Sequence, residues 1–337
     1  MITSNRRFGI EIEFVAPSSS ALEKIRNRIN VVDDGSLRPL ANAGEYVSDV
    51  LKGEDGEQTV EYACEVLKKY GAHSSDPKTS VHVHLDGAKR SSTLLSTKSL
   101  KDIPKDVQVY GLSSKLRKTL SDAHFRAAGK DGNLNYLTPD GIYVAKNIDN
   151  IKYFSSIPLT KQPMFNYTYY WIETEDRTKW LRNVFYFYTQ FSEVMEAIVS
   201  NSRKCGNMYC IPLAKSYDLA DIEKCKTMDD IYSVWYKGRD QGNHYDDSRY
   251  HNVNLHSYFE RNGTVEIRSH GGTIDPLKIL LWVKLHQKIV DKLEDMELED
   301  IKFTSNLYKE FVDFVEEPVL QGYVKRLLGY YSNITVK

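Results

Sequence analysis

The sequence predicts an α+β fold: an antiparallel sheet with an open, charged concave face and helices packed against its other, apolar face. Five segments alternate apolar and polar residues, which is the period of a half-buried strand. Their polar positions hold carboxylate, imidazole or guanidinium groups, and helical segments with apolar stripes lie between them. Burying so much charge without ligands is costly. The pattern therefore indicates bound cations and a polyanionic substrate.

The clearest of these strands is the first, residues 8–14 (FGIEIEF). Its apolar residues alternate with Gly9, Glu11 and Glu13, so both carboxylates lie on one face. Two adjacent carboxylates repel each other unless a cation lies between them, and paired oxygens on a rigid strand suit magnesium or manganese. The alternative for this segment alone is an edge strand with a solvated acidic face.

A short helix, a turn and a second strand follow. Residues 18–30 carry apolar side chains at helical spacing, and Asp34 and Ser36 flank a glycine that signals a tight turn. The polar groups of this turn are either ordinary turn chemistry or groups held at a strand end to receive a substrate. Residues 44–51 are predicted to form a strand. Its Glu45 would be a third carboxylate, after Glu11 and Glu13, on the inward polar face of the sheet.

The third polar-faced strand is rich in histidine. It follows an amphipathic helix predicted at residues 55–72. Residues 80–86 alternate again, with His82, His84 and Asp86 on one face. A single histidine is commonly a satisfied core or surface residue. Two on the same face, in a chain whose first strand carries two carboxylates, indicate a metal and phosphate site, because imidazole binds metals when neutral and phosphate when protonated.

The longest irregular stretch spans residues 91–176. It contains a predicted helix at 113–128 and aromatic-rich strands near 142–171. Long irregular segments in compact domains are usually functional, so this one is interpreted as an insertion that shapes a substrate pocket or as a lid-like subdomain.

A long helix is expected at residues 178–199, where its apolar stripe belongs to the core. The polar, glycine-containing loop at 201–210 can present Arg203 to an anionic ligand, although a plain surface loop is the alternative. A polar helix is expected at 219–235.

The last two polar-faced strands are predicted within residues 249–255 and 263–275, with the turn of an antiparallel hairpin at 260–263. Asp275 is then placed as N-cap and Pro276 as first residue of a helix that runs to residue 293, and 303–328 supply closing helices. The residues expected on the polar face of the two strands are Asn252, Asn254, Glu266, Arg268 and His270.

The composition of the chain limits which classes of function are compatible with the sequence. The 337 residues include 45 basic and 46 acidic ones, so no global charge attracts the chain to nucleic acid or to an anionic membrane. The four cysteines are sparse and lack metal-finger spacing, which fits reduced thiols in a cytosol. The sequence predicts neither a leader segment nor an apolar run long enough to span a bilayer. The expectation is a soluble, cytoplasmic protein without a membrane partner and without an indicated nucleic-acid partner.

Several of these motifs, taken in order, resemble the amidoligase family of the glutamine synthetase-like carboxylate-amine ligase superfamily. The resemblance covers most of the chain and departs from the compact family pattern in the length of residues 91–176. The motifs that carry it are Phe8-Gly-Ile-Glu-Ile-Glu-Phe14, Asp34-Gly-Ser36, Gly44-Glu45, His82-Val-His84, Ser202-Arg203, Arg249-Tyr250 with Asn252 and Asn254, and Gly263-Thr-Val-Glu-Ile-Arg268 with Gly272-Thr-Ile-Asp-Pro276.

The resemblance implies one catalytic domain over residues 1–337, with a curved antiparallel sheet like that of the glutamine synthetase catalytic domain and a probable insertion at about 91–176. It also implies a carboxylate-amine ligase: ATP phosphorylates a carboxylate, and an amine displaces the acyl phosphate to leave an amide. The cofactors would be ATP and Mg²⁺ or Mn²⁺. The partners would be a small-molecule or peptide carboxylate and an amine, and the sequence is compatible with an oligomer as well as a monomer.

The resemblance further implies roles for individual residues. One metal would be held by Glu13 and Glu45, and a second by Glu11, His82 and Glu266. His84 and Arg268 would contact phosphate groups, with Arg249 as a further nucleotide contact, whereas Arg203 or Arg249 would grip the substrate carboxylate. Arg268, Glu45 and Arg203 would act in catalysis. Asp34 lies in a motif whose order differs from glutamine synthetase, so it receives no role.

Two other readings stay open. The same architecture houses kinases that phosphorylate guanidino or amino groups, and a stable amide product would separate the ligase from these. A non-catalytic nucleotide-binding module is the third reading, and it fits poorly because such a module does not need all of these carboxylates together with Arg268.

Overall fold

The computed structural model describes residues 4–37, 39–87, 177–204, 206–238, 246–260 and 263–336, together with the backbone of 92–97 and 168–173. The strands are β1 (Phe8–Val15), β2 (Val31–Val32), β3 (Ala43–Val47), β4 (Ser80–Asp86), β5 (Ser92–Thr97), β6 (Thr168–Glu173), β7 (Val253–Asn254) and β8 (Thr264–Gly271). The α-helices are α1 (Ser19–Arg26), α2 (Gly53–Lys69), α4 (Thr178–Gln190), α5 (Ser192–Ala197), α6 (Leu219–Glu223), α7 (Met228–Tyr236), α8 (His256–Glu260), α9 (Pro276–Asp295), α10 (Leu307–Val315) and α11 (Pro318–Ser332). Short 3-10 turns lie at η1 (Gly35–Leu37), η3 (Asn201–Arg203), η4 (Leu213–Lys215), η5 (Asp247–Tyr250) and η6 (Leu298–Ile301).

The predicted α+β class is confirmed, and the central element is an open, antiparallel, six-stranded sheet. Its strand order is β2-β3-β1-β4-β8-β7, so the first strand of the chain lies near the middle. β1 pairs with β3 on one side and with β4 on the other. A separate antiparallel pair joins β5 and β6. Every strand of the larger sheet that carries predicted site residues is therefore next to another such strand.

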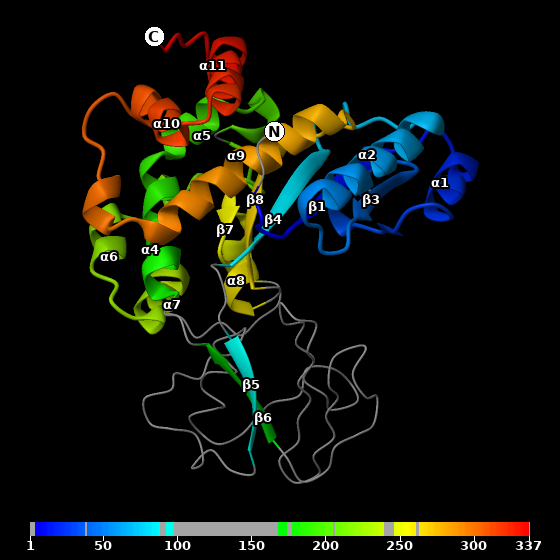
Figure 1. Ribbon diagram of the computed structural model, residues 1–337. Helices are drawn as coiled ribbons and strands as arrows, with labels where there is room; N and C mark the ends of the chain where they lie inside the picture. The colour runs from blue at the N-terminus through cyan, green and yellow to red at the C-terminus, as the bar shows by residue number, and fades with distance from the viewer. Residues whose placement is uncertain are drawn as a thin grey trace.

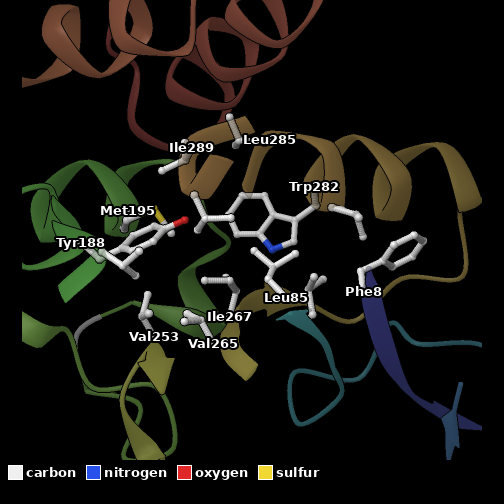
Figure 2. Packing of buried hydrophobic residues seen from close by; sticks show 14 of the residues in the cluster. Phe8, Leu85, Tyr188, Met195, Val253, Val265, Ile267, Trp282, Leu285 and Ile289 are labelled. Carbon is white, nitrogen blue, oxygen red and sulfur yellow. The ribbon is translucent and has the colours of Figure 1, made fainter. Parts of the chain in front are cut away.

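The apolar face of the sheet is covered by helices. Figure 1 shows α9 running across β4 and β8, with α2 beside it over β1 and β3. Trp282 and Ile289 of α9 are fully buried, as is Val60 of α2. In the close view of Figure 2, side chains of α9, α4 and α5 meet those of the strands; the labelled residues are Phe8, Leu85, Tyr188, Met195, Val253, Val265, Ile267, Trp282, Leu285 and Ile289.

Helix α9 begins as the sequence predicts. The side chain of Asp275 accepts a hydrogen bond of 3.0 Å from the backbone N–H of Leu277, and Pro276 occupies the first helical position. Closing helices are also found, as α10 inside the predicted range 303–328 and α11, which extends four residues beyond it to Ser332. The predicted helix at 113–128 lies outside the described residues.

The single long helix expected at residues 178–199 is wrong, because α4 ends at Gln190 and α5 begins at Ser192. The hydroxyl of Ser192 donates to the carbonyl of Tyr188 (3.0 Å) and accepts from the backbone N–H of Ala214 (3.1 Å). A serine hydroxyl that bonds back to the carbonyl four residues earlier bends a helix. The polar helix expected at 219–235 is similarly divided into α6 and α7, and Thr227 caps α7.

The antiparallel hairpin expected around 260–263 is found, but residues 261 and 262 of its predicted turn lie outside the described residues. β7 and β8 pair antiparallel as expected, with Asn254 opposite Glu266, but the short helix α8 lies in the connection. The backbone N–H of His256 donates to the Asn254 side chain (2.8 Å), which starts this helix directly after the strand. No helix in the described part of the chain has the length and apolar character that crossing a membrane requires.

Candidate metal centre

Strand pairing places the predicted site residues side by side on the polar face of the sheet. Glu13 of β1 is opposite Glu45 of β3, and Glu11 of β1 is opposite His82 of β4. On the other side of β4, His84 is opposite Glu266 of β8. Directly opposed residues of an antiparallel pair share a face with their Cβ atoms about 5 Å apart. Charged side chains from four consecutive strands therefore form one continuous cluster.

Glu11 lies between the two histidines. Its two carboxylate oxygens contact Nδ1 of His82 (2.8 Å) and Nε2 of His84 (3.1 Å). Burial alone would raise the pKa of Glu11. The charge of His84 and the hydrogen bonds from both imidazoles outweigh burial and hold this pKa well below its usual range. Glu11 is thus kept as an anion within a largely enclosed site.

Glu266 is the most enclosed carboxylate of the cluster, with 1% of its surface exposed. One oxygen accepts a hydrogen bond of 2.5 Å from Nη1 of Arg268, and the other accepts one of 2.6 Å from Nδ2 of Asn254. Nδ1 of His82 lies 3.7 Å from it. Burial opposes ionisation, but Arg268 and the histidines lower the pKa of Glu266 to about 2. Arg268 and Asn254 therefore fix both the charge and the orientation of this group.

Glu13 and Glu45 form the acidic end of the cluster. Glu13 is buried, and one of its oxygens accepts a hydrogen bond of 2.6 Å from the hydroxyl of Ser80. Burial, followed by the charge of Glu11 and of the other nearby carboxylates, raises the pKa of Glu45 to about 10. So many carboxylates cannot all carry charge in one place without a compensating cation.

The donor set fits a hard divalent cation. Three overlapping groups bring one ligand atom of each residue within 4.8 Å of the others, and the groups are Glu11, His84 and Glu266; Glu11, Glu45 and His82; and Glu13, Asp34 and Glu45. Carboxylate oxygens supplemented by imidazole suit magnesium or manganese. The residues present therefore fit the metals that the family resemblance implies.

Asp34 is the member of this set that received no role from the sequence. β2 pairs with β3 so that Val32 is opposite Glu45, and this pairing carries the following residues toward Glu13 and Glu45. The sequence signal was the Asp34-Gly35-Ser36 turn, in which the backbone N–H of Ser36 donates to the Asp34 carboxylate (3.0 Å). Turn chemistry alone did not reveal that the turn lies beside the first strand.

Two arginines lie near the cluster. Nη2 of Arg203 donates to the carbonyls of Lys78 (3.2 Å) and Thr79, directly before β4. Burial lowers the pKa of Arg203, whereas Glu266 and Glu11 raise that of Arg268 against burial. In both residues Nε is buried and has no hydrogen-bond partner among the described residues. Each of these N–H groups is available to an anionic oxygen.

Arg249, the other predicted anion contact, lies on η5. Its guanidinium carbon is 4.6 Å from the centre of the Tyr250 ring, and Nη2 donates to the Tyr250 hydroxyl (2.5 Å). These contacts do not include the carboxylates of the cluster, so its role as a nucleotide or substrate contact stays a prediction.

His270 does not share the polar face with Glu266 and Arg268, contrary to the alternation of the sequence. The register between β4 and β8 shifts between Val81 and Val83, so Val83 is opposite Ile267 but Val81 is opposite His270. Such a bulge inserts an extra residue and reverses the faces beyond it. The His270 ring lies 5.1 Å from the ring of Trp282 in α9, on the apolar side.

A comparison with known protein families finds a match that covers residues 172–290. This range matches the model of a family described as "Putative amidoligase enzyme", which supports the resemblance found in the motifs. The matched range includes Arg203, Arg249, Glu266 and Arg268. No curated protein matches the chain.

Proposed function

We propose that this chain, which matches the amidoligase family over residues 172–290, is an ATP- and metal-dependent carboxylate-amine ligase. The observation that carries the proposal is the continuous cluster of carboxylates and imidazoles across β3, β1, β4 and β8, with Arg268 and Arg203 beside it. A ligase of this kind needs groups that hold polyphosphate next to a carboxylate, and this donor set supports the proposal because it could hold the metal ions that bind polyphosphate.

The reaction we propose has two steps. In the first, an oxygen of the substrate carboxylate attacks the γ-phosphorus of ATP, the bond to the β-phosphate oxygen breaks, and ADP leaves. In the second, the amine nitrogen attacks the acyl carbon, the bond from this carbon to the phosphate oxygen breaks, and phosphate leaves as the nitrogen loses a proton. The substrates are a small-molecule or peptide carboxylate and an amine.

Bound Mg²⁺ or Mn²⁺ would neutralise the phosphate oxygens. Glu13, Asp34 and Glu45 would hold it at one end of the cluster, and Glu11, His82, His84 and Glu266 would hold it at the other. These assignments differ from the residue roles that the resemblance implies in two respects. Asp34 is added to the first set, and His84 joins Glu11 and Glu266 as a ligand instead of contacting phosphate.

The arginines would bind anionic oxygens. Arg268 is oriented by its bond to Glu266, and its buried Nε–H has no partner among the described residues. A planar guanidinium held in this way can donate to a phosphoryl oxygen while it stays paired with the carboxylate. Arg203 is fixed by two backbone carbonyls and would donate its remaining N–H groups to the substrate carboxylate.

The proposal is tested by measuring ADP release with ATP and Mg²⁺ or Mn²⁺ against pools of carboxylic acids and amines. Hydroxylamine is added to trap an acyl phosphate as a hydroxamate. Hydroxamate that depends on one acid is the expected result. ADP without hydroxamate under any acid would favour phosphoryl transfer to nitrogen, and no ADP with any pair would contradict the ligase.

Paired variants connect that assay to the site. Glu13→Gln should abolish ADP release while the fold is retained, because it removes a buried ligand charge at nearly constant volume. Glu61→Gln, an exposed residue of α2, makes the same chemical change away from the cluster and should leave ADP release unaltered.

A further inference from the structure

Ser269 of β8 carries a buried hydroxyl that has no hydrogen-bond partner among the described residues. The residue is 1% exposed, and its Oγ atom is itself buried. Leaving a buried hydroxyl without a partner is costly, and native proteins retain few such groups. A group of this kind, next to a cluster of charged side chains, points to a partner that the chain itself does not supply.

The bulge in β8 brings the side chain of Ser269 to the polar face of the sheet. Glu266 and Gly271 both pair with polar-face residues of β4. Alternation forward from Glu266 places Arg268 on this face. Alternation backward from Gly271 places Ser269 on it as well, because the extra residue of the bulge lies between the two counts. Arg268 and Ser269 are thus adjacent in the chain and share one face, both opposite His82.

The segment that contains η3 lies against this part of the polar face. A Cβ atom added to Gly271 would be 2.7 Å from the hydroxyl oxygen of Ser200, and η3 packs against β8. This segment carries Arg203, which is 5% exposed and is held by two backbone carbonyls through Nη2. The Nε–H of Arg203 has no partner among the described residues. The face that holds the Ser269 hydroxyl is therefore covered by a second unpaired donor.

Arg268 supplies a third unpaired donor, since its Nε is also buried without a partner in the described chain. Burial lowers the pKa of Arg203, and the charge of Arg268 lowers it further. The two guanidinium groups are thus close enough to repel each other. An anion between them would remove this repulsion and accept charge-assisted hydrogen bonds from both.

We propose that Ser269 is a binding residue, whose hydroxyl joins the Nε–H groups of Arg203 and Arg268 in donating to the anionic oxygens of a bound phosphate or carboxylate group. The inference rests on the proposed function, because the anion would belong to a substrate of the ligase, and it adds a hydroxyl donor to the two arginines. A phosphoryl group and a substrate carboxylate offer the same acceptor chemistry, so the experiment tests them separately.

The stability of the ligand-free protein distinguishes this role from a structural one. Ser269→Ala removes a hydroxyl that bonds to nothing in the described chain, so its urea midpoint should equal or exceed that of the native protein. Ser192→Ala is the matched control. Ser192 is also buried, but its hydroxyl bonds to the carbonyl of Tyr188 and to the N–H of Ala214. This control should have a lower urea midpoint than the native chain.

Binding should show the opposite pattern. The full chain, with Mg²⁺ present, is titrated at about pH 7 with inorganic phosphate and, in a second experiment, with acetate. A hydrogen bond to a charged group contributes enough that its loss raises a Kd by about 10–100-fold. Ser269→Ala should show this rise for at least one of the two probes, whereas Ser192→Ala should bind both as the native chain does. The probe that is affected identifies the group as phosphate or carboxylate.

Three results would overturn the proposal. Native Kd values for both probes in Ser269→Ala would exclude the hydroxyl from anion binding, and a native chain that binds neither probe would exclude the anion position. A urea midpoint clearly below the native value in ligand-free Ser269→Ala would show that the hydroxyl is already bonded within the protein. None of these measurements requires turnover, so each result leaves the ligase to be judged by ADP release and hydroxamate formation.

Discussion

Glu13 and Glu45 are directly opposed across β1 and β3, and the folded protein strongly opposes the ionisation of the Glu45 carboxyl. Burial and the neighbouring carboxylates raise its pKa from 4.5 to about 10. In the metal-free protein Glu45 therefore keeps a proton at neutral pH, and a cation in the cluster would take the place of that proton.

This pKa predicts how the stability of the metal-free protein depends on pH. Because the folded-state pKa lies above the unfolded-state value, the stabilisation is fully present below about pH 4.5 and is lost progressively as the pH rises toward 10. The free energy of unfolding is measured with urea and a chelator at about pH 6 and pH 9. Between these pH values it should fall less in Glu45→Gln than in the native chain. The slopes of this free energy against pH should differ between the two proteins by at most about 1.4 kcal/mol per pH unit. Equal slopes in the two proteins would argue against the raised pKa.

Arg268 should not tolerate replacement by lysine. Arg268→Lys keeps a positive charge near Glu266 but loses the planar guanidinium. In the native chain this group bonds to the Glu266 carboxylate and keeps its Nε–H unpaired among the described residues. Turnover should fall by at least about 100-fold, the cost of one oriented donor in a transition state. Arg326→Lys is the control, because Arg326 lies exposed on α11. Activity of Arg268→Lys close to that of Arg326→Lys would exclude Arg268 from the reaction.

The bulge in β8 predicts different outcomes for two histidines of the polar pattern. His84→Ala should abolish turnover, since His84 contacts Glu11. His270→Ala should retain turnover and lose stability on the order of 1 kcal/mol, because its ring packs against Trp282. Turnover and urea midpoints measured on both variants distinguish the two sides of the sheet. Loss of turnover in a folded His270→Ala protein would contradict the assigned face.

Replacement of Arg6, which lies outside the carboxylate and imidazole cluster, should strongly reduce the stability of the fold. Its side chain pairs with Asp291 (2.5 Å) and Glu294 (2.5 Å) of α9 and donates to the carbonyls of Asp86 and Gly87. Arg6 thereby joins the end of β4 to α9. Its side chain is 5% exposed. Arg6→Met should lower the free energy of unfolding by about 3 kcal/mol, because two partly buried carboxylates and two carbonyl groups lose a buried partner.

An exposed ion pair supplies the comparison for Arg6. Arg26 pairs with Asp33, and the two side chains are 40% and 82% exposed. Arg26→Met should therefore cost less than about 1 kcal/mol in the same urea experiment. Similar costs for the two variants would show that Arg6 is not the link between sheet and helix described above.

The sequence predicted well those features that depend on local periodicity. Glu11 and Glu13 on one face of β1, and His82 and His84 on one face of β4, follow from alternation within a single strand. The N-cap of α9 follows from two adjacent residues, Asp275 and Pro276.

Features set by contacts between distant segments were missed. The face of His270 depends on a bulge that exists only in the pairing of β8 with β4. Asp34 joins the cluster because β2 pairs with β3, which its own turn does not indicate. At the break at Phe191, the hydroxyl of Ser192 accepts a hydrogen bond from the backbone N–H of Ala214, in a segment beyond the helix. Local patterns predict which residues share a face of one strand. The register between strands decides which of these residues lie next to residues of the neighbouring strand.

The most direct test of the central claim follows an oxygen atom of the substrate acid. Once the hydroxamate assay has identified that acid, it is supplied with ¹⁸O in its carboxylate, together with ATP, the divalent metal and the amine, and the released phosphate is analysed by mass spectrometry. Activation through an acyl phosphate transfers one ¹⁸O to phosphate for each amide formed. Amide and ADP formed with no ¹⁸O in the phosphate would contradict the account.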